Sequence, residues 1–228
     1  TGMVAGNMMV DAGHGILRTL SPATRESEAT FRFEAKALGY ELSEEQPIGE
    51  FLQTIDPNVP TGMAVQREAQ KLLRGSGYMS IEAVDPEVHN GVGGYYSHVT
   101  APLRRLVDRF ATEYCLAIAG GYEVPDWVKT VQDEVLESMK RTSALAAQVD
   151  NACLDLTEAT VLRPWVGQNF NGVALSSDEE KATARLFIMD PPVFARGLGA
   201  PKAGTRQEFT LITADPVNRA VQFAWPAD

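Results

Sequence analysis

The residues best suited to chemistry stand in one run, Tyr96–Asp108, which reads Tyr-Ser-His-Val-Thr-Ala-Pro-Leu-Arg-Arg-Leu-Val-Asp. Pro102 favours the first turn of a helix, so the sequence predicts that Arg104 and Arg105 lie in that turn. Cations at a helix N-terminus oppose the helix dipole by several tenths of a kcal/mol. A bound anion would reverse this effect, because it would meet free backbone N–H groups and guanidinium forks together. The run therefore indicates an anion-binding site.

The same residues also have a plainer interpretation, as a surface arginine pair. Asp108 stands four residues after Arg104, which is the spacing at which opposite charges meet on a helix. On this interpretation Asp108 holds the Arg104 guanidinium, and neither arginine has a ligand. The residues alone leave both interpretations open.

The run resembles the signature Y-x-H-F-T-S-P-I-R-R-Y-x-D of the RNase II (RNB) family of 3′-5′ exoribonucleases. The matching residues are Tyr96, His98, Thr100, Pro102, Arg104, Arg105 and Asp108. Other segments resemble further landmarks of the family, in the family's order: Ala5–Asn7, Ile16–Pro22, His89–Gly93 and Gly167–Val173. The last of these is similar to the opening of an RNA-binding OB barrel. The resemblance spans nearly the whole chain.

The resemblance implies a hydrolytic exoribonuclease that threads single-stranded RNA into a channel and releases nucleoside monophosphates. In the family, Mg²⁺ activates the attacking water and stabilises the phosphate charge. Arg104 takes the place of the family's catalytic arginine, which would contact the scissile or a neighbouring phosphate. The residues implied in RNA binding are Tyr96, His98, Thr100, Arg105, Arg18 and Asn7. Leu17 falls where relatives have an aromatic that stacks on RNA, so we expect a weaker base clamp.

Two departures from the family concern catalysis. The family's metal-binding aspartates precede its A-N helix, and no D-x-x-x-x-x-D-x-D-D pattern occurs in this sequence. We therefore expect the Mg²⁺ ligands in a missing N-terminal half of the same protein, and we expect this chain alone to be inactive. An assisting glutamate of the family falls near Gln148, which cannot act as a base.

Two other functions stay open at this point. The first is a non-catalytic protein that binds single-stranded RNA on the same scaffold, which loss of the upstream aspartates would favour. The second is a helical interaction domain without a nucleic-acid role, in which Arg104 and Arg105 are ordinary surface residues.

Residues 1–160 read mainly as helices. The predicted apolar stripes are Phe31, Ala35 and Leu38; Met63, Ala69, Leu72 and Leu73; and Leu103, Leu106, Val107, Phe110, Tyr114 and Ile118. Gly39, Gly75 and Gly120-Gly121 follow these stripes as helix ends. A longer helix is predicted from Asp126 to about Leu156.

Residues 161–228 change to short strands separated by turn residues. The predicted strands are Phe170–Leu175, Ala182–Met189, Gln207–Thr213 and Ala220–Trp225. We predict an α+β chain, in which residues 1–160 form the C-terminal part of an RNB catalytic domain and residues 161–228 an antiparallel OB-like barrel. Phe170, Phe187 and Phe209 are predicted to lie mostly in the barrel core.

The composition is that of an ordinary globular protein, with 228 residues, 44% hydrophobic residues and a net charge of −10. The charge argues mildly against nucleic acid, but residues 161–228 carry seven basic and seven acidic residues, so the excess acid lies before them. Cys115 and Cys153 are predicted to be buried thiols, which fits a reducing compartment such as the cytoplasm. No apolar run is long enough to span a membrane, so a membrane partner is not expected.

Overall fold

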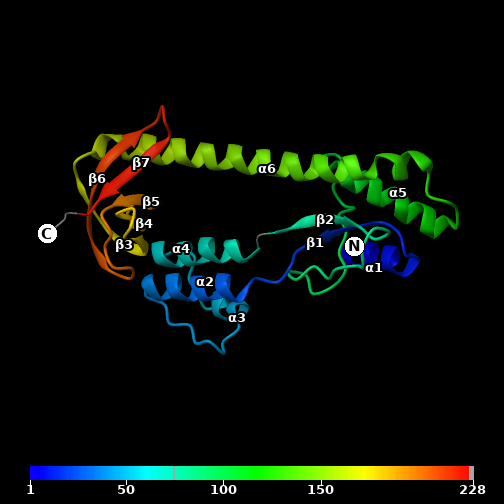
Figure 1. Ribbon diagram of the computed structural model, residues 1–228, viewed down its shortest axis with the longest axis horizontal. Coiled ribbons are helices and arrows are strands. Elements are labelled where there is room, and N and C mark those ends of the chain that lie inside the picture. Colours follow the sequence, from blue (N-terminus) through cyan, green and yellow to red (C-terminus); the bar gives the residue numbers. More distant parts are fainter. Residues whose placement is uncertain (74, 226–228) are drawn as a thin grey trace. The chain divides into compact units, whose positions relative to one another are not determined.

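The computed structural model describes residues 1–73 and 75–225, which form two compact units (Figure 1). The first unit combines Thr1–Ala23 with Leu73–Gln148, and the second combines Thr24–Leu72 with Val149–Asp228. Helix α6 (Asp126–Leu162) contributes residues to both units. The domain boundary between residues 160 and 161 stays a prediction, since residues 24–72 group with the barrel that follows it.

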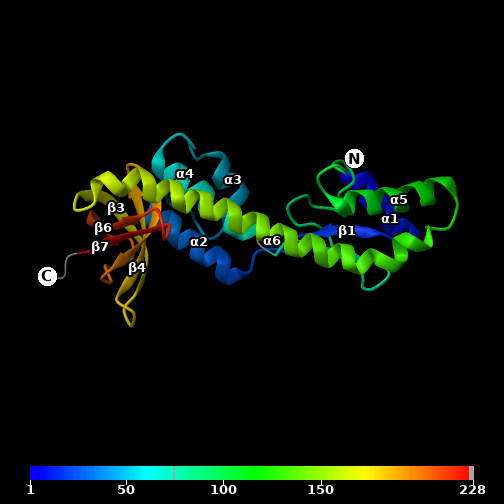
Figure 2. The same cartoon turned by 90° about the horizontal axis from the view of Figure 1, so that it is seen from above.

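The first unit packs helices against a two-stranded sheet. Helix α1 (Gly2–Ala12) lies beside α5 (Leu106–Gly120) in both views (Figure 1, Figure 2). Strand β1 (Ile16–Thr19) pairs antiparallel with β2 (Gly77–Ser80). The core joins α1, β1, α5 and the start of α6 through residues such as Met9, Leu17, Tyr114 and Val128, which are all fully buried. Leu17 is thus a core residue of this unit.

Helix α5 starts four residues later than the proline signal indicated. Residues 102–104 form a turn, and Arg105 is the extended N-cap, with φ −128° and ψ 116°. The Asp108 carboxylate accepts the Ala101 N–H at 2.7 Å, and this side-chain contact closes the turn in front of the helix. Leu103 and Leu106 are therefore exposed, and their placement on the buried stripe is wrong, whereas Val107, Phe110 and Tyr114 are buried as predicted.

The second unit contains α2 (Arg25–Ala37), α3 (Ile48–Gln53), α4 (Pro60–Ala69) and the 3₁₀ turn η1 (Gln70–Leu73). Thr24 caps α2 by accepting the Ser27 N–H at 3.1 Å. The stripe of Phe31, Ala35 and Leu38 is buried, as predicted. Met63 and Leu73 are exposed, because α4 turns Ala64, Val65 and Ala69 inward instead, so their assignment to the core is wrong.

The barrel is closed by five strands in the order β3-β4-β5-β7-β6. Their bounds are β3 Asn169–Asp178, β4 Thr183–Met189, β5 Pro192–Leu198, β6 Arg206–Asp215 and β7 Ala220–Ala224. All neighbouring strands are antiparallel except β5 and β7, which is the arrangement of an OB fold. The α+β class and the OB-like barrel are confirmed. Strand β5 was not predicted, because prolines and glycines interrupt its apolar pattern.

The barrel has an apolar core inside and a second one outside. Phe187 and Phe209 are buried as predicted, and the half-buried Phe170 contacts Phe223 edge-on at 5.8 Å between ring centroids. Phe187 faces outward, where it joins the core formed with α2, α3 and α4; Val173 and Leu175 join the same core. These helices thus cover an outer face of β3 and β4.

The two cysteines differ in exposure. Cys115 is half-buried on α5, whereas Cys153 is exposed on α6, so the prediction of a buried thiol is wrong for Cys153. Within residues 1–73 and 75–225, no helix is long and apolar enough to cross a membrane.

Candidate functional site

The segment around Tyr96 is docked onto α1 and β1 of the first unit. The Ser97 N–H donates to the Gly2 carbonyl at 3.0 Å, and the Ser97 hydroxyl donates to the Ile16 carbonyl at 2.7 Å. Gly6 allows α1 to approach closely, because a Cβ there would lie 2.7 Å from the Tyr95 carbonyl. The position of the signature run is therefore fixed by backbone contacts.

Four rings form a continuous row in this unit: His89, Tyr96, His98 and Tyr78, called here the aromatic row. Successive ring centroids lie 5.5, 5.6 and 5.6 Å apart, and each contact is edge-on. All four residues are half-buried. The row presents ring edges and polar atoms together, which suits contact with a nucleobase or sugar as well as simple packing.

His98 is held as a neutral imidazole. Burial, together with the nearby charges of Arg105 and Arg18, lowers its pKa to about 4. Burial raises the pKa of Tyr78, so its phenol keeps its proton, and the Tyr78 hydroxyl forms a hydrogen bond with His98 Nδ1 at 2.9 Å. When the phenol donates this bond, the single proton of the neutral imidazole lies on Nε2, where it can be donated to a ligand.

Arg18 is fixed from several sides. Its backbone N–H donates to the Tyr96 carbonyl at 2.8 Å, and its guanidinium donates to the Ser76 hydroxyl at 2.6 Å. The guanidinium also lies over the Tyr78 ring, 4.7 Å from the centroid. Arg18 thus brings a positive charge to the end of the aromatic row.

Arg105, and not Arg104, pairs with Asp108. Arg105 Nε donates to Asp108 Oδ1 at 2.8 Å, and its terminal nitrogen donates to Oδ2 at 2.9 Å. Asp108 is fully buried and Arg105 is half-buried. The predicted salt bridge between Arg104 and Asp108 is wrong, because the extended N-cap turns the Arg105 side chain toward the carboxylate instead.

Arg104 is exposed, and the structure gives its guanidinium no hydrogen bond or ion pair within residues 1–73 and 75–225. Its own N–H donates to the Ala101 carbonyl at 3.2 Å, which holds the backbone of the turn. Thr100, just before the turn, is also exposed. An unpaired guanidinium beside a clamped one is the arrangement that an incoming anion can use.

The remaining predicted residues do not gather at this turn. Asn7 is exposed on α1, where it lines a shallow pocket with Val4, Asp11 and Ile118, and no described contact joins it to the aromatic row. Gln148 is exposed on α6. Leu17 is fully buried and faces away from solvent.

Tyr78 is the functional candidate that sequence reasoning missed. It lies on β2, 20 positions before His98, and nothing in its local pattern distinguishes it from any other strand residue. Only the pairing of β1 with β2, which sets Arg18 opposite Tyr78, places it in the row.

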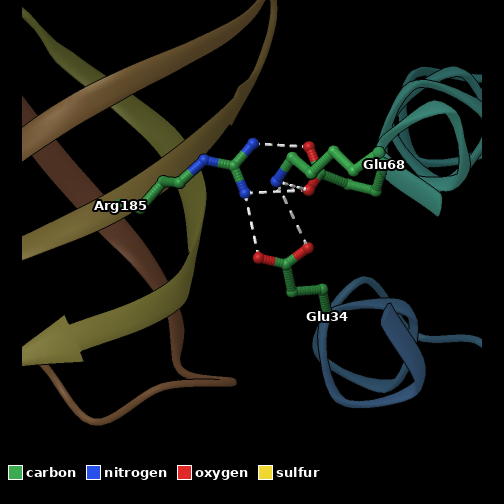
Figure 3. A network of polar contacts seen from close by, with 4 residues as sticks. Glu34, Glu68 and Arg185 are labelled. Carbon is green, nitrogen blue, oxygen red and sulfur yellow. Dashed lines mark hydrogen bonds and ion pairs between the residues drawn. The ribbon is translucent and has the colours of Figure 1, made fainter. Parts of the chain in front are cut away.

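The second unit holds a buried group of charges that the sequence also did not reveal (Figure 3). Arg185 of β4 donates to Glu34 of α2 at 3.0 Å and to Glu68 of α4 at 2.9 Å. Lys71 pairs with both glutamates as well. Burial, together with the neighbouring Glu68, raises the pKa of Glu34 to about 7. Burial alone would raise the pKa of Glu68 too, but hydrogen bonds with Glu34, Arg185 and Lys71 hold it well below its usual range.

Neither the residues around the aromatic row nor the buried charges around Arg185 form a metal-binding site. Across the described ranges, no three His, Cys, Asp or Glu side chains come together in a way that could hold a metal ion. These residues therefore do not fit a Mg²⁺ site, and a Mg²⁺ requirement stays a prediction.

The barrel sequence is similar to one family model. Residues 168–225 match the RNase II-type exonuclease C-terminal S1 domain. A search of curated proteins gives no significant match.

Solved structures share the fold of nearly the whole chain. RNase R from Mycoplasma genitalium superposes with a TM-score of 0.73 at 12% identity, both without RNA and in complex with ribose-methylated single-stranded RNA. The match covers 99% of this chain and 40% of the RNase R chain. Yeast Ssd1, a pseudonuclease, gives a TM-score of 0.65 at 16% identity over 99% of this chain and 28% of its own. An active-site mutant of the Dss1 exoribonuclease from Candida glabrata gives 0.64 at 13%, over 98% and 27%. Such low identities establish the fold alone.

Proposed function

We propose that the chain acts on single-stranded RNA as part of a 3′-5′ exoribonuclease, a proposal supported by the match of residues 168–225 to the RNase II-type exonuclease C-terminal S1 domain. The observation that carries the proposal is the free, exposed Arg104 guanidinium beside Arg105, which the buried Asp108 clamps. The chain spans 40% of the RNase R chain that it matches, so the activity belongs to a larger protein in this proposal.

In this proposal each residue of the first unit has a distinct role. Arg104 contacts a phosphate of the RNA, and its planar fork can bind two phosphate oxygens. Arg105 and Asp108 are positioning residues, because they fix the turn that carries Arg104. His98 offers its Nε2 proton to the strand, and Arg18 adds positive charge beside the row. Mg²⁺ held by the rest of the protein would supply the activated water.

The test is a comparison of Arg104 variants in the whole protein that contains this chain. If Arg104 stabilises charge that develops as the P–O bond breaks, Arg104→Ala should lower the single-turnover rate by roughly a hundred- to thousandfold. RNA affinity should fall much less, and Arg104→Lys should recover only part of the rate. Near-normal cleavage by Arg104→Ala would refute the catalytic role.

Arg105→Ala serves as the matched control for Arg104→Ala. It removes a neighbouring cation but also leaves the buried Asp108 without its ion pair, so we expect a loss of stability of roughly 3 kcal/mol. Arg105→Ala should therefore lower both stability and turnover, since it also loosens the turn that carries Arg104, whereas Arg104→Ala should lower turnover and leave stability unchanged. The thermal midpoint of both variants separates the two effects.

A second function is favoured by the similarity to yeast Ssd1, a pseudonuclease. On that alternative the whole protein binds single-stranded RNA without cleaving it. RNA binding that depends on Arg104, with no release of nucleoside monophosphates in Mg²⁺, would select this alternative.

A further inference from the structure

His89 stands at one end of the aromatic row, in a turn that hydrogen bonds of the main chain hold in place. The His89 N–H donates to the Gly94 carbonyl at 3.0 Å, and the Val92 N–H donates to the His89 carbonyl at 2.9 Å. The Asn90 N–H donates to the Leu20 carbonyl at 2.8 Å, which ties the turn to the residue that follows β1. The backbone therefore fixes the point from which the His89 side chain extends.

One nitrogen of the His89 ring is buried without a partner. Nδ1 forms no hydrogen bond in the part of the chain that the structure describes. Leaving a buried polar atom unsatisfied costs roughly 1 to 3 kcal/mol, so its presence in a folded protein calls for a reason other than stability. Burial, and after it the charge of Arg18, lowers the pKa of His89 from its usual value. The imidazole is therefore neutral at pH 7, and Nε2 is the nitrogen that can reach a ligand.

His98 has the same features. Its ring centroid lies 5.6 Å from that of Tyr96, and the His89 centroid lies 5.5 Å from the same ring. Nδ1 of His98 is hydrogen-bonded with the Tyr78 hydroxyl, which leaves Nε2 for a ligand here too. The row thus holds two uncharged imidazoles against one tyrosine, and each has Nε2 as its available nitrogen.

The positive charge near these two histidines belongs to arginines. Arg105 and Arg18 both lower the pKa of His98, whereas Asp108, which raises it, is clamped by Arg105. Protonating a histidine would add a further cation to this region, which like charges disfavour. Phosphate contacts therefore fall to the arginines, and the imidazoles remain for the uncharged parts of a nucleotide.

We propose that His89 is a specificity-determining residue of the RNA site, which together with His98 donates a neutral N–H to an acceptor atom of a nucleoside, on its ribose or its base. The inference rests on the proposed function, since it places single-stranded RNA at the aromatic row. A neutral donor adds hydrogen bonding without another ion pair, so its contribution to binding is not screened by salt. The unsatisfied Nδ1 is then the cost in stability of holding the ring where Nε2 meets the ligand.

The experiment measures RNA binding by the whole protein that contains this chain, without divalent metal so that no strand is cleaved. His89→Phe keeps an aromatic ring against Tyr96 and removes both nitrogens. Affinity for a short uridylate RNA should fall on the order of tenfold. The slope of log affinity against log salt should stay unchanged, because no phosphate contact is lost, whereas Arg104→Ala should reduce it by about 0.7.

Stability separates this role from a structural one. His89→Phe removes a buried atom without a partner, so its thermal midpoint should equal or exceed that of the parent while affinity falls. A histidine that only packs would lose stability and affinity together. His89→Gln retains a neutral N–H donor on its side-chain amide and should recover part of the affinity. His14→Phe is the matched control, since His14 is a half-buried histidine of the same unit that packs on Tyr114, with ring centroids 5.9 Å apart, and it should bind as the parent does.

Two further probes identify the atom that His89 contacts. The loss caused by His89→Phe should vanish on the 2′-deoxy strand if the contact is to the ribose, and on a strand of abasic riboses if it is to the base. An equal loss on all three strands, a salt slope reduced by about 0.7, or unchanged affinity of His89→Phe would overturn the inference and leave the role of Arg104 standing. A parent protein that binds none of the strands would overturn the proposed function together with it.

Discussion

Arg104 and Arg105 are neighbours in sequence but differ in what each guanidinium is free to do. The Arg105 guanidinium donates its hydrogen bonds to Asp108, which is fully buried and also accepts the Ala101 N–H. Removing one partner of such a pair leaves an uncompensated buried charge. Within the described residues the Arg104 guanidinium has no ion pair, so it can bind a ligand without first losing a hydrogen bond to the protein.

The protonation of His98 gives a prediction at the same scale. The folded protein lowers the His98 pKa from 6.5 to about 4, so the imidazole should be neutral with its proton on Nε2 throughout the neutral range. Since the unfolded chain takes up this proton near pH 6.5, stability from His98 should be lost as pH falls from 6.5 toward 4. Nitrogen-15 shifts of the ring report both the tautomer and the titration midpoint.

Tyr78→Phe is the control for this assignment. Without the phenol, Nδ1 loses its donor, and the preference for the Nε2–H tautomer should weaken while the fold is kept. An Nδ1–H tautomer in the parent would show that Tyr78 does not set the tautomer of His98, and a midpoint near 6.5 would show that burial and the two arginines do not lower its pKa.

At the scale of elements, close approach of backbones sets the position of the aromatic row. Helix α1 reaches the Tyr95–Ser97 segment through glycines, and that segment in turn hydrogen-bonds with β1. The resemblance of Ala5–Asn7 to a family landmark therefore has a physical basis in Gly6, which is the residue that touches the signature run. Asn7 itself faces solvent.

Replacing Gly6 with alanine should destabilise the first unit. The added Cβ would lie 2.7 Å from the Tyr95 carbonyl and 2.8 Å from the Tyr96 nitrogen, and backbone atoms cannot rotate away. We expect a loss of about 1 to 3 kcal/mol of unfolding free energy, as for other overpacked sites. Gly49→Ala in α3 is the control, since its Cβ would meet no atom within 4 Å and alanine favours helix. Equal stability of the two variants in urea unfolding would contradict the close-approach argument.

The buried charges that join α2 and α4 to β4 give a second prediction for elements. Glu34 titrates at about 7 in the folded protein against 4.5 ordinarily, so the folded state retains a proton that the unfolded state releases. Stability should therefore fall as pH rises from 4.5 to 7, by roughly 3 kcal/mol. Glu34→Gln mimics the protonated form and should flatten this slope. His98 contributes with the opposite sign over much of this pH range, so the test is the difference between the parent and Glu34→Gln, and equal slopes in the two proteins would refute the assignment.

For the whole molecule, the sequence predicted whether a segment is a helix or a strand more accurately than it predicted which face of the element is buried and where the element begins and ends. Alternating apolar residues in β3, β4, β6 and β7 were sufficient to predict an OB-like barrel, but β5 begins at proline and was missed. The phase of α4 was wrong because Met63 looked like a core residue, whereas Ala64 and Val65 pack there. Contacts between distant residues, such as Tyr78 with His98 and Arg185 with Glu34, have no local signal at all.

The covering of the barrel by α2, α3 and α4 leads to the last prediction. Val173, Leu175 and Phe187 are at most 1% exposed in the chain, and they pack on Phe31 and other residues of the helices. A piece made of residues 160–228 alone would place this apolar face in water and would lose Arg185's acidic partners. Exposing side chains of this kind costs roughly 1.5 to 3 kcal/mol each, which is a large share of the stability of a small barrel.

We therefore expect residues 160–228 alone to unfold at lower temperature than the barrel within the chain, to bind an apolar dye and to self-associate. Phe187→Ser in the isolated piece should reduce dye binding, because it removes apolar surface from the uncovered face. The same substitution in the whole chain should instead destabilise the second unit, since Phe187 is buried there. Reduced dye binding of the isolated piece together with lower stability of the whole chain would establish that the helices cover the barrel. A stable, monomeric piece that binds no dye would show that they do not.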